Sequence, residues 1–455
     1  MSPRRPDPSP APWPEHERFP ATVVPRPAPI PAAPDVVVIG AGAAGIAAAR
    51  RLIERGRSVA VLEARGRVGG RAVTTALRGH AIDLGAHWMH AGPINPLVAL
   101  ARERGERMWT APQHGHLVVG GRAATAAEQA AFGTAFDVAD RALTRGARAG
   151  GPDRPAAHAM PPALGPWRER IARVHGLVSG RPLGEVSLQD WPSLEYGDNH
   201  FVRGGYGAYL ARLAQGLPIR LRAPVARIAW SGEGVRIETE DGATVEAGAA
   251  IVTVPMMVLR DTVRFSPALP AAVRAAIDGF RPGIYEHAVL HWPSAPFRGR
   301  DRLASVVSGR HRPPGLLTRI DGTPFHYFEL DAPMAAGVDA RTAGRETTAD
   351  ATRRVVRAVL GDHFGPRALR DLAVPAVTAW RHDPYARGSW AVVPPGHAGA
   401  RDALKAPVGE RIWFAGEALS HVQWGTAGGA YAEGLRAADA VADRMAGERA
   451  APAAA

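Results

Sequence analysis

Apolar runs and an amphipathic, alanine-rich stretch alternate near the start of the chain. Val36-Val37-Val38-Ile39 is fully apolar and is followed by glycines, then by the segment Ala43–Arg55 and a second apolar run, Ser58–Leu62. Short unbroken apolar runs are typical of buried strands, whereas a longer alanine-rich segment favours a helix. The order of these segments predicts a β-α-β unit, the beginning of a parallel sheet.

Residues 94–190 look mostly helical, and two strand-rich blocks follow them. Nucleotide-binding patterns stand at the start, the middle and the end of the chain, so we expect one domain assembled from three separate segments. A chain of 455 residues also exceeds one ordinary core, which favours two domains. The later strands are expected at Ile219–Leu221, Val225–Trp230, Val235–Thr239, Thr244–Val245, Ala250–Val254, His287–Trp292, Phe325–Leu330 and Arg411–Ala415, and the later helices at 347–361 and Gly428–Met445.

Both ends of the chain are expected to be irregular. Residues 1–34 contain twelve prolines, which fix φ and remove backbone donors, so an extended and disordered tail is predicted there. Three roles are open for this tail: a linker, a tether, or no function. Residues 447–455 are predicted to form a flexible C-terminus.

The formal charge of +12 first suggests a nucleic-acid partner. However, Lys405 is the only lysine, and the remaining 54 basic residues are arginines in a chain that is also rich in alanine, glycine and proline. No run of five consecutive basic residues occurs. We therefore expect a solvated basic surface and no nucleic-acid partner.

Composition also bears on compartment and on cofactor attachment. The longest apolar candidate, Val36–Ala49, is interrupted by glycines and falls short of the ~20 residues that a membrane span needs. No apolar stretch follows Arg4 and Arg5, so a secretory signal is not expected. The predicted location is the cytoplasm, with no membrane partner. The absence of cysteine excludes disulfides, thiolate metal sites and a cysteinyl link to a cofactor.

The glycines after the first apolar run have the spacing of a dinucleotide-binding turn. Gly40 permits a tight turn, Gly42 lets the backbone approach a pyrophosphate, and Gly45 lets the helix pack closely on the strand. Phosphates are then favoured at the helix N-terminus by free N–H groups and the dipole. Glu63 lies 23 residues after Gly40, close to the spacing of the carboxylate that binds a ribose.

A second glycine-rich element follows directly. Arg65, Gly69, Gly70 and Arg71 belong to the stretch Glu63-Ala64-Arg65-Gly66-Arg67-Val68-Gly69-Gly70-Arg71. The glycine pair would allow a second close approach of the backbone, and the arginines offer forked donors to phosphate oxygens. Because a simple NAD fold has no need of this element, the combination favours FAD.

These and later motifs together resemble the flavin-containing amine oxidases, a family that includes monoamine oxidases, polyamine oxidases and histone lysine demethylases. The similarity covers nearly the whole chain after the tail, and it is loose over about 100–190. The matching stretches are VVVIGAGAAG, LEARGRVGGRAVT, DLGAHWMHAGPINP, VRGGYGAYLARLA, PVARI, AAIVTVPMMVLRDTVRFSPALP, DPYARGSW with VPPG, and RIWFAGEALSHVQWGTAGGAYAEGLRAA.

The resemblance implies an α/β, two-domain flavoprotein. Its Rossmann-like FAD-binding domain would be built from the discontinuous segments 35–90, 202–282 and 400–446. An α+β substrate domain would comprise 91–201 and 283–399. The cofactor would be FAD, bound non-covalently, because Ser389 stands where monoamine oxidases carry their flavin-linking cysteine.

The resemblance also assigns cofactor contacts by position. Glu63 would hold the adenosine ribose and Arg71 the pyrophosphate, and Val225 would bond the adenine through its backbone. The helix that starts at Thr426 and Ala427 would stabilise the reduced flavin through its N-terminus. The complete implied set is Gly40, Gly42, Gly45, Glu63, Arg65, Gly69, Gly70, Arg71, the backbone of Gly85-Ala86-His87-Trp88, Val225, Gly416, Glu417, Thr426 and Ala427.

The resemblance implies three residues on the substrate side: Trp390, His90 and His287. Trp390 would stand over the flavin's substrate face and exclude water, the alternative being ordinary core packing. Its second aromatic partner is open, since Thr426 replaces the tyrosine of monoamine oxidases and Trp424 is a nearby candidate. His90 would lie near the substrate amine or bond loop backbone. Acids that could bind a second amine group are Glu195, Asp198 and Glu286.

His287 occupies the position of a lysine that many family members place beside flavin N5. An imidazole with a pKa near 6.5 would titrate within the working range, unlike an ammonium. We therefore expect flavin reoxidation by O₂ to be faster below the His287 pKa than above it. The alternative is that the register slips and His287 is a bonded strand histidine.

The implied activity is that of an FAD-dependent amine oxidase. Hydride would pass from the α-carbon of a small-molecule amine to flavin N5, and O₂ would reoxidise the flavin, giving an imine, then an aldehyde or ketone, and H₂O₂. No metal-ligand spacing and no Ser-His-Asp set is apparent. The alternatives are an L-amino acid oxidase, a C–C desaturase or similar flavoenzyme, and a non-catalytic flavin-binding partner protein.

Overall fold

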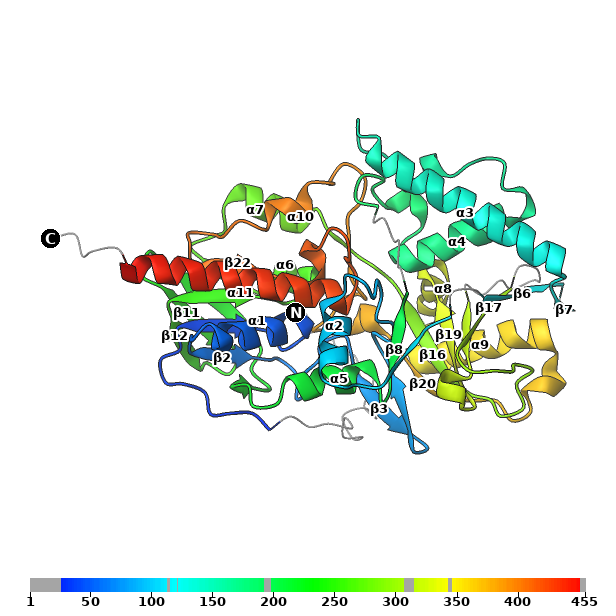
Figure 1. Cartoon of the computed structure of the whole chain (residues 1–455), viewed down its shortest axis with the longest axis horizontal. Helices are drawn as coiled ribbons and strands as arrows, with labels where there is room; N and C mark the ends of the chain where they lie inside the picture. Colours follow the sequence, from blue (N-terminus) through cyan, green and yellow to red (C-terminus); the bar gives the residue numbers. More distant parts are fainter. Residues whose placement is uncertain are drawn as a thin grey trace, which may run out of the picture.

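The computed structural model describes residues 26–112, 115–120, 122–191, 198–306, 315–342 and 346–450. Figure 1 shows two units side by side, one built around a parallel sheet and the other around a mostly antiparallel sheet. Within the described ranges, no helix is both long and apolar enough to cross a membrane.

The parallel sheet forms the centre of the first unit. Strand β1 (Val36–Ile39) pairs with β2 (Val59–Leu62) on one side and with β13 (Ala249–Val252) on the other. Strands β9 (Ile219–Arg220) and β22 (Ile412–Phe414) complete the order β22-β13-β1-β2-β9. Neighbouring strands therefore come from distant parts of the sequence, which makes this unit discontinuous.

Layers cover both faces of this sheet, which explains why its strands read as unbroken apolar runs. Alternate residues of β1 point to opposite faces, with Val36 and Val38 in one core and Val37 and Ile39 in the other. Helices α1 (Ala43–Glu54), α2 (Pro96–Glu103), α5 (Tyr206–Leu213) and α11 (Ala427–Ala450) cover the first face. The second face carries β10 (Val225–Trp230), β11 (Val235–Thr239), β12 (Thr244–Ala247), β14 (Arg264–Ser266), α6 (Met256–Thr262), α7 (Ala271–Asp278) and α10 (Ala400–Ala403).

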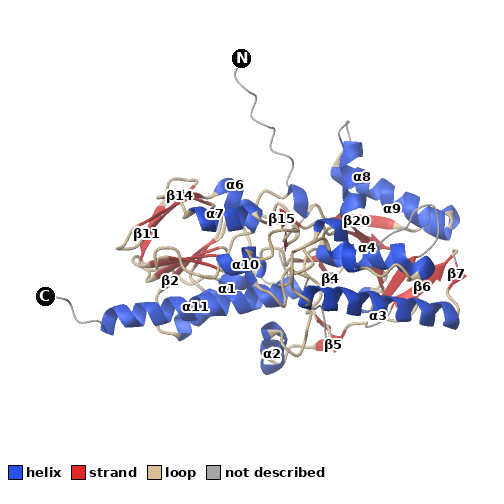
Figure 2. Cartoon of the chain, turned by 90° about the horizontal axis from the view of Figure 1, so that it is seen from above, coloured by secondary structure: helices blue, strands red, loops and turns tan. Residues whose placement is uncertain are grey.

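The second unit contains a sheet in the order β20-β16-β19-β18-β17-β6-β7. Helices α8 (Ala332–Thr342) and α9 (Thr348–Phe364) pack on one face. Helices α3 (Ala126–Arg148) and α4 (Arg168–Ser179) contribute to a cavity over the other face, and Figure 2 shows α3 running along this unit as α11 runs along the first. The strands are β6 (Gly115–Val119), β7 (Arg122–Ala123), β16 (Glu286–His291), β17 (Arg302–Val306), β18 (Leu316–Thr318), β19 (Phe325–Leu330) and β20 (Ala373–Val377).

Three short two-stranded pairings lie near the junction of the units. Strands β3 (Thr74–Leu77) and β4 (His80–Asp83) form a hairpin that leads into the loop 84–90. Strand β5 (Met108–Thr110) pairs with β8 (His200–Val202), and β15 (Arg281–Pro282) pairs with β21 (Ala391–Val392).

The expected fold class is confirmed, and most expected strands and helices lie within a few residues of their predicted positions. The largely helical prediction for 94–190 is wrong around Met108–Ala123, which forms β5, β6 and β7. Strand β6 pairs in parallel with β17, with Gly115 opposite Leu303. Local periodicity cannot reveal a pairing between residues so far apart.

The predicted domain bounds remain a prediction, and three local observations bear on them. Helix α2 packs in the core of the first unit, although it lies within the segment assigned to the substrate domain. Helix α11 continues to Ala450, so residues 447–450 are helical rather than irregular. Ala28 N–H donates to Leu217 O over 3.0 Å, so the part of the predicted tail within the described residues is held against the first unit. Residues 1–25 lie outside the described ranges.

Candidate functional site

A single elongated cavity of about 810 Å³ reaches from the glycine-rich turn of the first unit to the sheet of the second. At one end it is bordered by the predicted nucleotide-binding residues. At the other end it is bordered by α3, α4 and the strands of the second sheet. Predicted site residues that line it are Gly40, Gly42, Glu63, Arg65, Gly69, Gly70, Arg71, Gly85, Ala86, His87, Trp88, His90, Val225, His287, Trp390, Gly416, Glu417, Thr426 and Ala427.

The glycines form a backbone cradle because side chains have no room there. Gly40 has φ +105°, a left-handed conformation that favours glycine. A Cβ at Gly45 would overlap the backbone oxygen of Gly40, so α1 can approach β1 only without one. A Cβ at Gly70 would stand 3.3 Å from Gly42 Cα, which brings the two glycine elements together at one place.

The carboxylate of Glu63 joins these two elements. One oxygen accepts from Ala41 N–H over 2.7 Å, and the other accepts from Arg65 N–H over 2.8 Å. The side chain is buried at 6% exposure yet lines the cavity. Backbone donors therefore hold a buried negative charge at the place where a ribose would offer hydroxyl donors.

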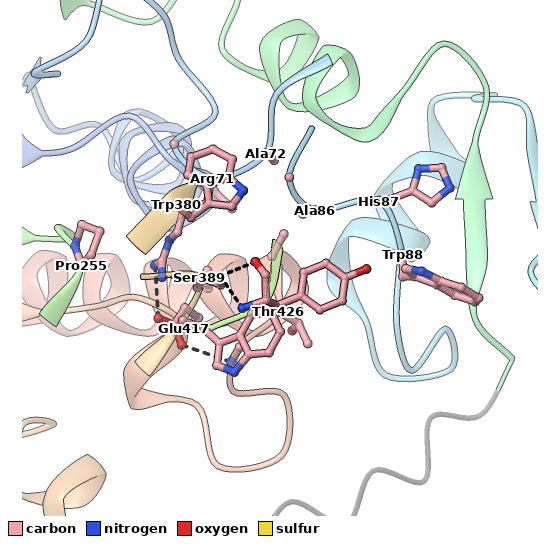
Figure 3. A pocket seen from close by; sticks show the side chains of 18 of the residues that line it. Arg71, Ala72, Ala86, His87, Trp88, Pro255, Trp380, Ser389, Glu417 and Thr426 are labelled. Carbon is pink, nitrogen blue, oxygen red and sulfur yellow. Dashed lines mark hydrogen bonds and ion pairs between the residues drawn. The ribbon is translucent and has the colours of Figure 1, made fainter. Parts of the chain in front are cut away.

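The two predicted phosphate-binding arginines have protein partners in the structure. Arg65 forms an ion pair with Asp383, and its guanidinium lies 5.4 Å from the centre of the Tyr385 ring. Arg71 donates to Ser389 O over 2.9 Å and to Glu417 Oε1 over 3.1 Å (Figure 3). Both side chains remain at the cavity wall. The sequence named Glu417 as a site residue but not its pairing with Arg71, and it did not name Asp383.

Glu417 connects three segments beneath the cavity. Besides Arg71, its carboxylate accepts from Ala391 N–H over 3.1 Å and from Gly425 N–H over 3.1 Å. A few residues later, Thr426 caps α11, since its hydroxyl oxygen accepts from Gly429 N–H over 2.9 Å. The predicted placement of a helix N-terminus at the cavity is therefore present in the geometry.

Trp390 is held tightly at the cavity wall. Its Nε1 donates to Ser179 O over 3.0 Å, and Cβ atoms at Gly180 or Gly283 would stand 2.7 and 2.8 Å from its indole ring. The ring of Tyr285 lies beside it, with centroids 5.6 Å apart. Tyr285 is thus the aromatic neighbour that the sequence left open.

Trp424, the candidate partner for Trp390, has a different role in the packing. Its Nε1 donates to Asp190 O over 3.1 Å, and the guanidinium of Arg401 lies 4.9 Å from its ring. Arg401 and Asp190 form a buried ion pair with N–O distances of 2.7 Å. Trp424 borders the cavity but is fixed by this buried network.

His287 lies in the cavity wall, but the expectation that its imidazole titrates within the working pH range is wrong. Its Nε2 is 3.2 Å from Asp83 O, and its backbone N–H donates to Thr378 Oγ1 over 2.8 Å. Burial lowers the pKa of His287 to about 4, with a smaller contribution from the nearby His87 and a partial opposing effect from Asp83. The imidazole is therefore neutral across the working range and does not titrate near 6.5.

The loop 84–90 presents two further histidines to the cavity. His87 Nδ1 is 3.0 Å from Asp83 Oδ2, and its ring packs against Phe201 at 4.4 Å between centroids. His90 stacks on Trp88 at 6.0 Å between centroids, and burial lowers the pKa of His90 to about 4. Figure 3 shows His87 and Trp88 on the side of the cavity away from Arg71 and Glu417.

Glu329 is a cavity residue that the sequence reasoning missed. It pairs with His287 across β16 and β19, so both side chains lie on the same face of the sheet. Tyr285 donates its hydroxyl to Glu329 Oε1 over 3.2 Å, and burial raises the pKa of Glu329. The period-two pattern of Phe325–Leu330 predicts that Glu329 and Tyr327 lie on the same face of the strand. It does not predict on which side of the sheet that face lies.

The acids considered for a second amine group are placed elsewhere. Glu286 points to the opposite face from His287, where Thr378 and Arg381 bind its carboxylate. Asp198 is exposed and is not among the cavity residues. Glu195 lies outside the described residues.

The geometry defines the class of protein. A glycine cradle, a buried carboxylate held by two backbone N–H groups and a helix N-terminus all border one elongated cavity, and these features fit an adenine dinucleotide that reaches toward an aromatic pair. The fold and site are thus those of a dinucleotide-binding protein whose cavity extends from the parallel-sheet unit into the second unit.

Comparison with known proteins gives the family. A sequence profile described as "Flavin containing amine oxidoreductase" matches residues 43–145 and 156–442, so the chain belongs to this family. Polyamine oxidase 4 of Oryza sativa subsp. japonica is 30% identical over 90% of this chain and 89% of its own length. Lysine-specific histone demethylase 2 of Homo sapiens is 27% identical over 90% of this chain, which spans about half (53%) of that protein.

Solved structures support the fold. Wild-type putrescine oxidase bound to putrescine superimposes with a TM-score of 0.73 and 21% identity, covering 92% of this chain and 100% of that one. The expected family, fold class, FAD cofactor and enzyme class are confirmed. The chain is an FAD-dependent oxidoreductase that acts on amines.

Proposed function

We propose that this chain oxidises a C–N bond of a diamine, a small amine with one further ammonium group, and uses O₂ as the electron acceptor with release of H₂O₂. The observation that carries this proposal is the position of Glu329. It places a carboxylate on the cavity face directly beside His287 and Tyr285. A carboxylate there offers an ammonium group a charge-assisted hydrogen bond.

The aromatic pair Trp390 and Tyr285 supports an amine at this end of the cavity. The two rings are tilted by 33° with centroids 5.6 Å apart, and both border the cavity. Rings in this arrangement attract a cationic group and exclude water from it. The solved structure named as putrescine oxidase bound to putrescine favours a diamine, and the relative named as polyamine oxidase favours an amine with more than one nitrogen.

His287 is proposed to orient the amine in its neutral form. Asp83 O can only accept, so His287 Nε2 carries the hydrogen and Nδ1 keeps a lone pair. An amine is oxidised in its neutral form, and the Nδ1 lone pair of a neutral imidazole beside the aromatic pair can accept a hydrogen bond from the amine N–H without adding a positive charge to the site. Trp390 and Tyr285 orient the amine, and Glu329 holds its second ammonium.

FAD supplies the two-electron oxidation. We propose that it is held non-covalently by the cradle of Gly40, Gly42 and Gly70, by Glu63 at the ribose and by the N-terminus of α11. Val225, at the start of β10 where the strand pairing is irregular, would bind the adenine through its backbone. Arg65 and Arg71 support this proposal through their positions on the cavity wall.

A peroxidase-coupled assay with monoamines, diamines, polyamines and amino acids tests the proposed function. A diamine is expected to give the highest kcat/KM of the panel. Glu329→Gln should raise KM for the diamine by roughly tenfold or more and leave KM for an alkyl monoamine nearly unchanged, because only the diamine uses the carboxylate. Glu233→Gln, at an exposed turn, is the matched control. A larger effect on the monoamine than on the diamine would contradict the assignment of Glu329.

A further inference from the structure

A row of residues crosses the second sheet along the cavity floor. His287 on β16 faces Glu329 on β19. Glu329 N–H donates to Gly315 O over 3.1 Å just before β18, and Ser305 on β17 pairs with Leu117 on β6. Because neighbouring strands lie about 4.8 Å apart, these positions form successive steps away from His287. All five residues border the cavity.

Arg170 enters this row on the far side of Glu329. It belongs to α4, is 5% exposed, and donates from Nη2 to Ser305 Oγ over 2.8 Å. A Cβ at Gly315 would stand 2.5 Å from Glu329 Oε2 and 3.7 Å from Arg170 Nη2, so Gly315 leaves the space between the two charges open. The order along the floor is therefore His287, Glu329, Arg170.

The charge on Arg170 is expected to persist at neutral pH. Burial lowers the pKa of Arg170 to about 10, which still leaves the guanidinium protonated. Glu329 lies close enough to oppose that lowering. Glu329 is thus followed by a buried cation along the path that a long substrate would take.

We propose that Arg170 is a specificity-determining residue that restricts the substrate to one ammonium group beyond the oxidised C–N bond. This inference rests on the proposed function and names its substrate class. A diamine places its second ammonium at Glu329, and a triamine would have to place a third ammonium beside the buried guanidinium. Like charges a few ångströms apart in a site of low dielectric repel strongly.

The repulsion is expected to act on charge and not on length. Beyond Arg170 the cavity is bordered by Leu117 on β6 and by Phe132 and Phe136 on α3, which suit an uncharged chain. Asp137 also borders the cavity, but it is exposed on α3 and therefore well screened. A diamine with an N-alkyl extension as long as a triamine should therefore be accepted.

The test compares kcat/KM of the holoenzyme for a diamine, a triamine and an N-alkylated diamine of triamine length. The wild type should prefer both diamines to the triamine. Arg170→Met should raise the triamine-to-diamine ratio on the order of tenfold or more, with little change for the alkylated diamine. Arg168→Met removes an exposed arginine from the same helix and should leave the ratio unchanged. A ratio that stays within about twofold in Arg170→Met, or a wild type that prefers the triamine, would overturn the proposal.

Two further variants test the proposal if Arg170→Met does not fold. Arg170→Lys keeps the charge and should keep the selectivity, whereas Ser305→Ala releases Nη2 and should weaken the selectivity. Equal ratios in Ser305→Ala, Arg170→Lys and the wild type would also contradict the inference. If no amine yields H₂O₂, the proposed function fails. Calorimetric binding of the three amines to the same holoenzymes then decides the role of Arg170, through the ratio of triamine affinity to diamine affinity.

Discussion

The Nε2 atom of His287 lies 3.2 Å from the backbone oxygen of Asp83, and this contact fixes the form in which the imidazole meets the cavity. Since a carbonyl oxygen only accepts, the proton resides on Nε2 and the lone pair on Nδ1. Burial holds the pKa of His287 at about 4. A neutral acceptor therefore stands where many members of the family carry a lysine.

This neutrality predicts the pH dependence of flavin reoxidation. The rate with O₂ should show no step from His287 between about pH 6 and pH 9, and such a step should appear only toward pH 4, because the ring gains its charge there. His287→Lys should speed reoxidation at neutral pH by adding a cation. Stopped-flow mixing of reduced enzyme with O₂ measures both effects. A step near pH 6.5 that disappears in His287→Ala would show that the ring titrates normally.

Glu63→Gln should weaken FAD binding. The change replaces a charge-assisted acceptor by a neutral amide, which costs about 1–3 kcal/mol and corresponds to a roughly ten- to hundredfold higher Kd. One amide oxygen also cannot replace both carboxylate oxygens that serve Ala41 and Arg65. Fluorescence titration of the apoprotein with FAD measures the change. An unaltered Kd would mean that Glu63 only ties the two loops together.

The flavin should be released by acid. The chain contains no cysteine, and Ser389, which aligns with the flavin-linking cysteine of monoamine oxidases, donates its Oγ hydrogen to Tyr285 O over 2.6 Å. Acid precipitation of the yellow holoenzyme should leave all of the colour in the supernatant. Colour retained in the pellet would reveal a link through another side chain.

Gly45→Ala should abolish FAD binding or folding. Its Cβ would meet a backbone oxygen, that of Gly40, which cannot move away as a flexible side chain could. Gly337→Ala in α8 is the matched control, because nothing lies within 4 Å of its added Cβ and alanine stabilises a helix interior by about 0.5–1 kcal/mol. Thermal unfolding with and without FAD compares the two. Equal stabilities would contradict the close packing of α1 on β1.

Trp390→Ala should slow flavin reduction far more than it lowers FAD content. The indole faces Tyr285 and is fixed by Ser179, so its loss opens the amine side of the cavity to water. Anaerobic reduction by an amine, together with the flavin-to-protein absorbance ratio, separates the two effects. A parallel loss of FAD and of rate would instead make Trp390 a cofactor contact.

The features predicted from sequence are those carried by short, local patterns. The turn at Gly40, Gly42 and Gly45 and the spacing to Glu63 are encoded within one β-α-β unit, so the cradle could be anticipated. Arg65 was placed near the phosphates, but its partner Asp383 is 318 residues away, and no local pattern joins them. The same limit hid strand β6 and its partner β17.

The substrate side was harder to predict for a related reason. The strands holding His287 and Glu329 were both expected, yet only their register brings the two side chains together on one face. Tyr285 became visible as the neighbour of Trp390 only once β15, β16 and β21 were placed. Arg170 lies in the region of loosest resemblance, where sequence alone offered no reason to prefer it among 54 arginines.

The arrangement of the parallel sheet has a consequence for the order of events during synthesis. Strand β1 is made about two hundred residues before its neighbour β13, and α11, which packs along α1, is made almost four hundred residues after α1. The apolar residues of α1 that contact α11 therefore remain exposed until α11 has been made. We expect chaperones to bind the nascent chain there, and FAD to be captured only after α11 has left the ribosome.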